Sequence, residues 1–402
     1  MATEPVTRLF FPELISVNSR LREQIAVANL DHDNRPDLIL YDESNIRLLV
    51  NTSEGDGFSF NDVGFGYTGV NIRQVVPYNK NSNTDIDLLV LANEVYTIMD
   101  VNVDSASAFT ISHELQTDNF RQVQVGDINA DGFQDLVMIN NTGALIIRAG
   151  DTSDTFNRNK EAYTLKPDYQ QVRLADLDGN GSLEILASNG SQIDAYTLNN
   201  FNTWRFDSTD IQVIASSASG IIDFTVQDFG GSRSADARGV FDVALVTQDS
   251  LEVFQNETVS EKKYLFTPRK DNFVDVQLTP QSIIYGDFNK DGLLDLCLSD
   301  RESGQFSVWR KYSWKPKVQA QMLRRHEITL TWDPFPDSLG TIDFYRVMRD
   351  TVSYVMNPDA YIRETYSNQF VDREVEDYRS YWYSVQAVYN DGIEGDWSEP
   401  VL

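Results

Sequence analysis

A cluster of acidic and amide side chains recurs along this chain at a nearly constant interval. The stretch VGDINADGFQDLVMIN shows the pattern, in which polar residues stand at every second or fourth position around one glycine: Asp127, Asn129, Asp131, Asp135 and Gly132. Similar clusters return at steps of about 49, 49, 49, 52 and 59 residues along the chain. A period of roughly 40–50 residues is typical of repeat architectures, in which each repeat is one small supersecondary unit. The sequence therefore predicts an array of six units.

Within each unit the apolar runs are short, rich in β-branched and aromatic residues, and separated by Gly, Asn, Asp and Ser. The third unit contains FRQVQVGD, DLVMIN, GALIIRAG and EAYTLK in turn, which predicts four short antiparallel strands. Four-stranded sheets repeated around an axis are the blades of a β-propeller. The six units are centred on residues 27–42, 75–93, 125–140, 174–189, 226–246 and 285–300.

The predicted fold class is all-β, with a six-bladed β-propeller as its main part. The last unit is short of strands after Asp287, so the N-terminal run VTRLFFPELI is expected to supply the missing strand and close the last blade. A seven-bladed propeller, with one blade too degenerate to recognise, stays open as the alternative.

The period ends near Trp314, and the remaining ninety or so residues have a different pattern. Alternating strands, with Trp332 on an early strand and several tyrosines on a later one, predict a C-terminal β-sandwich. The chain is therefore divided into residues 1–314, the propeller, and residues 315–402, the sandwich.

The amino-acid composition limits the classes of partner that this chain can bind. Thirty-three basic and sixty-one acidic side chains give a formal net charge of −28, which repels nucleic acid and anionic lipid and favours cations. This charge argues against nucleic-acid binding, and no apolar run is long enough for a membrane helix, so membrane insertion is not expected. The stretch MATEPVTRLF lacks the apolar region of a signal peptide, so the protein is either intracellular or exported by a signal that was removed or not included in this sequence. The single cysteine, Cys297, lies in an apolar strand and is expected to be an inert core thiol.

The acidic loops have the spacing of a calcium cage. Oxygen ligands at positions 1, 3, 5 and 9, with a backbone carbonyl at position 7, suit a hard cation of calcium size. Glycine at position 6 allows the sharp reversal that closes such a loop. Each loop alone reads equally well as an ordinary Asx-turn between strands, because Asp, Asn and Gly dominate turns. Repetition at matching positions favours the metal, because clustered carboxylates repel one another without a cation.

Four loops fit the template, and three to four bound Ca²⁺ ions are expected. The predicted ligands are Asp127, Asn129, Asp131, Phe133 and Asp135 in the third unit; Asp287, Asn289, Asp291, Leu293 and Asp295 in the sixth; Asp176, Asp178, Asn180, Ser182 and Glu184 in the fourth; and Asn29, Asp31, Asp33, Arg35 and Asp37 in the first. The units at 75–93 and 226–246 are interpreted as metal-free turns.

At these motifs the chain resembles FG-GAP/VCBS repeats, the blades of integrin-α-like propellers, over roughly residues 6–314. The resemblance implies calcium binding by the four loops listed above. Residues 315–402 resemble a fibronectin type III domain, with Trp332, Tyr345 and Tyr381 at the positions of its conserved aromatics. Asp377 and Tyr378 replace the family's frequent Pro-Gly, which is a small departure.

Both resemblances imply an extracellular or cell-surface protein. The leading hypothesis is a non-enzymatic, calcium-binding recognition or adhesion module that presents propeller loops to a protein or a glycan. A calcium-dependent carbohydrate-active enzyme, either a lyase or a hydrolase, is the first alternative, although the three histidines, His32, His113 and His326, are too dispersed to share a site. A scaffold subunit of a surface or secretion assembly is the second. The specific ligand and the oligomeric state are not predicted.

Overall fold

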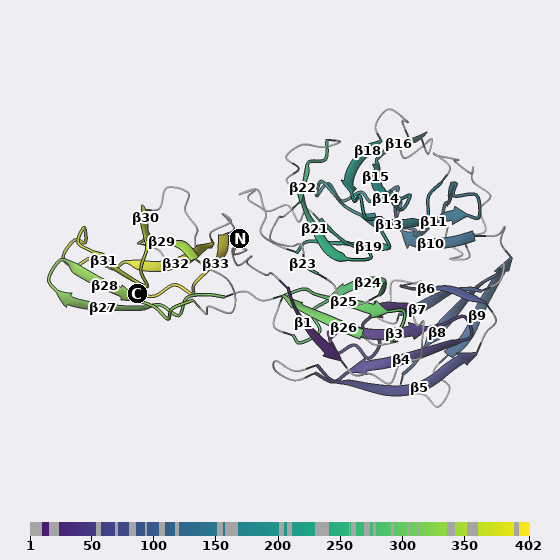
Figure 1. The fold of residues 1–402 in the computed structure, drawn as a ribbon, viewed down its shortest axis with the longest axis horizontal. Coiled ribbons are helices and arrows are strands. Elements are labelled where there is room, and N and C mark those ends of the chain that lie inside the picture. The colour runs from purple at the N-terminus through teal and green to yellow at the C-terminus, as the bar shows by residue number, and fades with distance from the viewer. Residues whose placement is uncertain are drawn as a thin grey trace. The chain divides into compact units, whose positions relative to one another are not determined.

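Two compact units, Phe10–Lys311 and Tyr312–Leu402, make up the computed structural model (Figure 1). Every regular element in the described residues is a β-strand, which confirms the all-β class. No helix in this part of the chain is long and apolar enough to span a membrane. The structure describes residues 10–15, 24–53, 58–68, 71–79, 86–92, 95–103, 109–116, 120–150, 156, 168–200, 205–206, 211–229, 241–256, 258, 263–268, 274–275, 279–290, 293–303, 306–311, 314–335, 342–351, 361–389 and 394–402.

The larger unit consists of small antiparallel sheets, an arrangement consistent with a β-propeller. Their strands, sheet by sheet, are β2 (Gln24–Ala28), β3 (Asp37–Tyr41), β4 (Asn45–Asn51) and β5 (Phe60–Thr68); β6 (Ile72–Tyr78), β7 (Asp87–Ala92), β8 (Val95–Val101) and β9 (Phe109–Gln116); β10 (Phe120–Gly126), β11 (Asp135–Asn140) and β12 (Leu145–Arg148); β13 (Gln171–Ala175), β14 (Glu184–Ser188), β15 (Gln192–Tyr196) and β18 (Gln212–Ser216); β19 (Asp223–Gln227), β20 (Asp242–Val246), β21 (Ser250–Asn256), β22 (Phe266–Pro268) and β23 (Val274–Asp275); and β24 (Pro280–Gly286), β25 (Asp295–Asp300), β26 (Phe306–Lys311) and β1 (Phe10–Ile15). A further two-stranded sheet pairs β16 (Leu198–Asn200) with β17 (Arg205–Phe206).

The same hairpin opens each of these multistranded sheets. Its first strand ends opposite the acidic residue that begins the second strand. The paired residues are Ala28 and Asp37, Tyr78 and Asp87, Gly126 and Asp135, Ala175 and Glu184, Gln227 and Asp242, and Gly286 and Asp295. The acidic loop of each predicted unit therefore occupies the same place in its sheet, including the two units without a metal motif.

The first strands of the sheets follow one another around a ring (Figure 1). β2 contacts β6, β6 contacts β10, and the series continues through β13, β19 and β24, which contacts β2 again. The N-terminal strand β1 pairs with β26, from Phe10 opposite Lys311 to Ile15 opposite Phe306. The two ends of this unit are thus joined in one sheet, as the sequence predicted.

The core lies between neighbouring sheets. On β3, Leu38 and Leu40 pack in one cluster with Cys297, whereas Ile39 packs on the other side with Leu88. Because alternate residues of a strand point to opposite faces, a strand buried on both faces reads as a continuous apolar run. Cys297 is fully buried, and burial raises the pKa of its thiol, which agrees with an inert core residue.

The smaller unit contains two sheets, β27-β28-β31 and β30-β29-β32-β33 (Figure 1). Residues of both sheets share one apolar cluster, in which Trp332 packs against Tyr345 with ring centroids 5.2 Å apart. The hydroxyl of Tyr381 accepts a 3.2 Å hydrogen bond from the backbone N–H of Glu376. The relation of this unit to fibronectin type III domains stays a prediction. Its strands are β27 (Gln319–Arg324), β28 (Glu327–Thr331), β29 (Ile342–Asp350), β30 (Tyr361–Thr365), β31 (Gln369–Asp372), β32 (Trp382–Tyr389) and β33 (Glu394–Trp397).

Candidate metal sites in the acidic loops

The fourth loop, between β13 and β14, brings three carboxylates together. Ligand oxygens of Asp176, Asp178 and Glu184 all lie within 4.8 Å of one another. The loop curls because the backbone N–H groups of Asn180 and Gly181 donate to the Asp176 carboxylate at 3.1 and 2.7 Å. Gly181 has a φ of +87°, a left-handed conformation that glycine adopts without strain. This acidic triad has the donor chemistry of a site for a hard cation.

Glu184 is the most constrained member of the triad. It is almost fully buried, and its Oε2 accepts a 2.8 Å hydrogen bond from the Leu177 N–H. Its Oε1 is also buried, and the Tyr264 hydroxyl interacts with this carboxylate. Burial, and then the nearby charges of Asp178 and Asp176, raise the pKa of Glu184 to about 8. A cation among these oxygens would offset both the burial and the repulsion, so the residues present fit a bound metal.

The third loop, between β10 and β11, has the same backbone curl with different side-chain pairing. The N–H groups of Asp131 and Gly132 donate to Asp127 at 3.1 and 2.8 Å. The Asn129 amide donates to the Asp131 carboxylate at 3.0 Å. Asp127, Asp131 and Asp135 do not gather as closely as the fourth loop's triad, which is the one such acidic group found among the described residues.

In the first loop, between β2 and β3, Asn34 takes a left-handed φ of +66°, as expected for an asparagine in the glycine position. The side chain of Arg35 forms a 3.4 Å ion pair with Asp33. Asn29 contributes a buried side-chain oxygen that has no hydrogen-bond partner in the described chain. This loop therefore offers the buried side-chain oxygen of Asn29, but the carboxylate of Asp33, a predicted ligand, already forms an ion pair with Arg35.

The sixth loop, between β24 and β25, is described only in part. Asn289 is buried, Lys290 has a φ of +60°, and Asp295 is fully buried. Asp291, the predicted ligand at position 5, lies outside the described residues. The ligand set of this loop stays a prediction.

The acidic residue at position 9 has a structural role that the sequence analysis missed. Asp135 accepts one hydrogen bond from the Ile128 N–H at 3.0 Å and another from the Gly150 N–H at 2.7 Å. Asp242 makes the same pair of contacts with Phe229 and Asn256, at 3.0 and 2.8 Å, although its unit lacks a metal motif. This carboxylate therefore ties the start of the loop to the end of the third strand, whether or not a metal is bound.

The carboxylates at position 9, called the clasp carboxylates below, are buried, and burial changes their pKa values. Burial raises the pKa of Asp37 to about 6 and that of Asp135 to about 7, although each accepts two backbone hydrogen bonds that oppose the shift. The sequence carries one signal for the clasp: an acidic residue begins the second strand in all six units. These residues include Asp87 and Asp242, which belong to the two units without a metal motif.

The end of the third strand also joins neighbouring sheets. The Asn51 amide donates to the Phe288 carbonyl at 2.9 Å, and the Asn256 amide donates to the Leu177 carbonyl at 2.8 Å. In both cases the acceptor is position 2 of the acidic loop in the neighbouring sheet. Each of these loops is therefore held by its own sheet and by the next one.

Comparison with protein families gives one match. Residues 127–187 match the FG-GAP-like repeat. The match begins at the first ligand position of the third loop and includes the whole acidic triad of the fourth. No curated protein sequence matches the chain at a significant level.

Several solved structures are similar in fold. BBS1N in complex with ARL6DN is 12% identical, with a TM-score of 0.47 over 77% of this chain and 98% of that chain. An Agrocybe aegerita lectin that recognises non-reducing terminal N-acetylglucosamine is 11% identical, with a TM-score of 0.42 over 70% of this chain and 75% of that chain. A Trichoderma reesei carbohydrate-active enzyme of family AA12, in a calcium structure, is 10% identical, with a TM-score of 0.46 over 78% of this chain and 98% of that chain.

Proposed function

We propose that the larger unit is a six-bladed β-propeller that binds calcium in its acidic loops and acts as a non-enzymatic extracellular recognition module for a protein or a glycan. The blade count is supported by the closed ring of contacts among β2, β6, β10, β13, β19 and β24. The FG-GAP-like match at residues 127–187 supports the repeat class.

The observation that carries the proposal is the acidic triad of the fourth loop. Three carboxylates within 4.8 Å, two of them buried, are costly to hold as charges in a metal-free protein. Oxygen-only ligands at this spacing favour calcium over the softer transition metals, which prefer nitrogen or sulfur. The fourth loop is therefore the strongest site, with the third, first and sixth loops as further sites, for three to four ions in total.

Calcium in these loops would stiffen the surface that meets the ligand. The loops connect the first two strands of their sheets, so a cation there fixes the hairpin that begins each blade. Extracellular calcium modules work at millimolar-range affinity, and a stiff loop loses less conformational entropy when a partner binds. The proposed activity is therefore recognition of a partner at the cell surface by loops that calcium has stiffened.

The test combines metal analysis with unfolding. Purified protein should contain calcium by elemental analysis, and its thermal midpoint should fall when a chelator is added and recover when calcium is returned. A variant with Asp176→Asn and Glu184→Gln should bind fewer ions than the matched control Asp249→Asn, which changes an exposed turn residue outside the loops. Metal-free protein with an unchanged midpoint would refute the calcium part of the proposal.

Recognition requires a separate screen. Immobilised glycans and extracellular-matrix proteins should be probed with the calcium-loaded protein and with the chelated protein. Calcium-dependent binding to one class supports the proposal and identifies the ligand. Turnover of a polysaccharide in the same screen would instead favour an enzyme and overturn the non-enzymatic assignment.

A further inference from the structure

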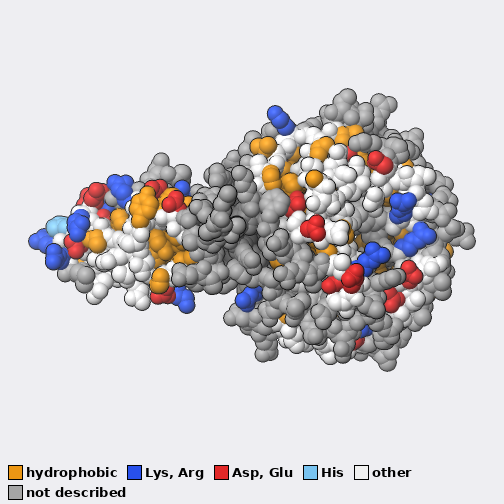
Figure 2. All heavy atoms as spheres, in the orientation of Figure 1, with side chains coloured by type: hydrophobic (Ala, Val, Ile, Leu, Met, Phe, Trp, Pro, Cys, Tyr) orange, Lys and Arg blue, Asp and Glu red, His pale blue; other side chains and the backbone are white. Residues whose placement is uncertain are grey.

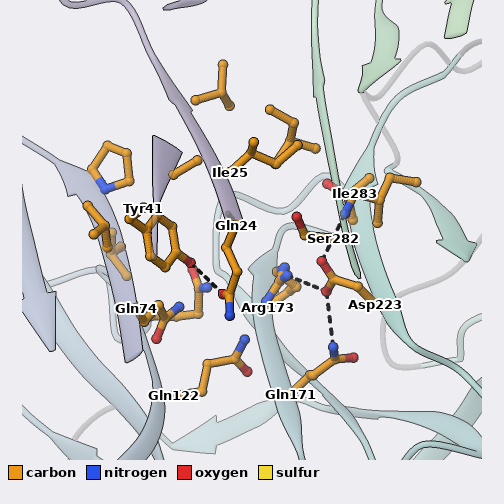
Figure 3. Close-up of a pocket in the computed structure, with 18 of the residues that line it drawn as sticks. Gln24, Ile25, Tyr41, Gln74, Gln122, Gln171, Arg173, Asp223, Ser282 and Ile283 are labelled. Carbon is orange, nitrogen blue, oxygen red and sulfur yellow. Dashed lines mark hydrogen bonds and ion pairs between the residues drawn. The ribbon is translucent and has the colours of Figure 1, made fainter. Parts of the chain in front are cut away.

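A cavity of about 490 Å³ opens where the first strands of the six sheets meet (Figure 3). A volume of roughly 300–1,000 Å³ is usual for small-molecule sites. Its lining is unusually rich in amide side chains, which come from every sheet except the one that begins with β19: Gln24, Gln74, Gln122, Gln124, Gln170, Gln171 and Gln281. The space is therefore polar and is shaped by the ring as a whole.

Strand register places six of the lining residues at equivalent positions. Each of them lies on the first strand of its sheet. It precedes by four residues the first-strand residue that pairs with the acid at the start of the second strand. These residues, of which four are glutamines, are called the amide ring below: Gln24, Gln74, Gln122, Gln171, Asp223 and Ser282. Figure 3 shows their side chains directed into the same space from different strands.

Two glutamines of the amide ring join neighbouring sheets through their side-chain carbonyls, whereas the Gln171 amide donates to the Ile222 carbonyl and to Asp223. Gln74 accepts a 2.7 Å hydrogen bond from the Val123 N–H, and Gln122 accepts one of 2.5 Å from the Val172 N–H. In both cases the donor immediately follows the next member of the ring. These bonds hold the side chains in place, so the amide N–H₂ groups of Gln74 and Gln122 remain as fixed donors toward the cavity.

Three arginines line the same cavity. The guanidinium groups of Arg73 and Arg121 donate to the backbone carbonyls of Phe120 and Asn141, at 3.0 and 2.8 Å, and form no ion pair in the described part of the chain. Arg173 forms a 2.7 Å ion pair with Asp223. Asp223 is the only acidic residue among the described lining residues, so three arginines and one carboxylate give this lining an excess of positive charge in a chain of net charge −28.

The cavity is separated from the acidic loops along the strands. The amide ring lies near the start of each first strand, and the acidic loop follows the end of that strand, roughly 13 Å away at about 3.3 Å per residue. On the displayed face of the larger unit, basic side chains lie with acidic side chains beside them (Figure 2). An anion that approaches the amide ring is therefore held away from the carboxylates of the loops.

We propose that this central cavity binds a sugar acid, that is, a saccharide unit with a carboxylate such as a uronate. The guanidinium groups of Arg73 and Arg121, which form no ion pair among the described residues, suit the carboxylate, since charge-assisted hydrogen bonds to arginine are strong and directional. The fixed amides suit the hydroxyl groups, because a hydroxyl both donates and accepts. This inference rests on the proposed function as a recognition module and adds to it a second ligand site, for sugar acids, apart from the acidic loops.

Titration calorimetry on the whole protein tests the proposal. The probes are the methyl glycosides of glucuronate and galacturonate, with methyl glucoside and acetate as controls. At least one uronate should bind about tenfold more tightly than methyl glucoside and acetate, and its affinity should fall as salt is raised. Equal binding of the uronate and the neutral sugar, or no binding of any uronate in the millimolar range, would overturn it.

Variants locate the site. A double Arg73→Gln, Arg121→Gln variant should lose about tenfold or more in uronate affinity, whereas Arg301→Gln, which removes an exposed arginine from a turn outside the cavity, should not. Gln24→Glu provides a second variant of nearly unchanged shape. It keeps the acceptor for the Tyr41 hydroxyl, at 2.9 Å in the wild type, and adds a repelling charge. Full uronate affinity in both cavity variants would refute the assignment.

Calcium content is measured on the same samples, so the two proposals fail separately. Bound calcium without uronate binding refutes the cavity assignment alone. Uronate binding that survives complete loss of calcium supports the cavity and refutes the need for the metal in recognition.

Discussion

The side-chain amide of Asn256, at the end of β21, donates a 2.8 Å hydrogen bond to the backbone carbonyl of Leu177 in the acidic loop of the neighbouring sheet. The same amide also donates to the Phe241 carbonyl at 3.1 Å, and its oxygen accepts from the Thr258 N–H at 3.0 Å. Leu177 in turn donates its N–H to Glu184. One buried side chain therefore links the fifth sheet to the acidic triad of the fourth.

Replacing Asn256 with alanine should weaken both the fold and the triad. The change leaves buried carbonyls without donors, which costs about 2–3 kcal/mol of unfolding free energy in this setting. Calcium affinity should fall as well, because Leu177 loses one of its two anchors. Urea unfolding and calcium titration measure the two effects, with Asn141→Ala, at an exposed turn position, as the control. Equal stability of the two variants would contradict the linkage.

The metal-free protein should become less stable as the pH rises from about 5 to about 8. The folded-state pKa values of Asp37, Asp135 and Glu184 are raised to about 6, about 7 and about 8. In that range the folded state binds more protons than the unfolded state, so raising the pH favours unfolding. The loss is complete only above the folded-state pKa of each group.

Calcium should remove most of this dependence, because a cation stabilises the charged carboxylates. Protein stripped of metal and desalted is expected to have a thermal midpoint that falls on the order of 5 °C between pH 5 and pH 8. With saturating calcium the midpoint should change much less. A metal-free midpoint that rises over this interval would show that the buried carboxylates are stabilised as charges without calcium.

Two glycines near the third loop should respond differently to alanine. A Cβ at Gly150 would lie 2.0 Å from the backbone oxygen of Gln134, so Gly150→Ala forces a shift of main chain and should cost about 3 kcal/mol or prevent folding. A Cβ at Gly132 meets nothing within 4 Å, and only its φ of +87° opposes the change. Gly132→Ala should therefore cost about 1 kcal/mol. Chemical unfolding of both variants checks the order, and a larger loss for Gly132→Ala would contradict it.

Much of the fold could be read from the sequence because its signals are local. Each acidic loop and the apolar run after it lie within about fifteen residues, and the repeat period predicts six such hairpins, with a degenerate seventh left open. The strand supplied by Phe10–Ile15 was also foreseen, since the last unit was visibly short.

The details of the sites depend on contacts that the sequence does not mark. Asn51 lies 237 residues from the Phe288 carbonyl that it binds, and nothing local indicates that pairing. Arg73 and Arg121 come together only when the ring of sheets closes. Side-chain orientation decides which loop brings its carboxylates together, and a template of residue spacing contains no information on orientation. In the third loop, for example, the Asn129 amide donates a hydrogen bond to Asp131.

The fifth unit offers the sharpest test of the clasp. Asp242 accepts from the N–H groups of Phe229 and Asn256 in a unit without a metal motif, so its role there is structural. Asp242→Asn removes one acceptor and should reduce the unfolding free energy by about 1–3 kcal/mol while leaving the number of bound calcium ions unchanged. Glu184→Gln should instead lower the calcium content, because the same position in the fourth unit belongs to the acidic triad. Elemental analysis and urea unfolding on both variants separate the two roles, and loss of calcium in Asp242→Asn would show that the fifth unit binds metal after all.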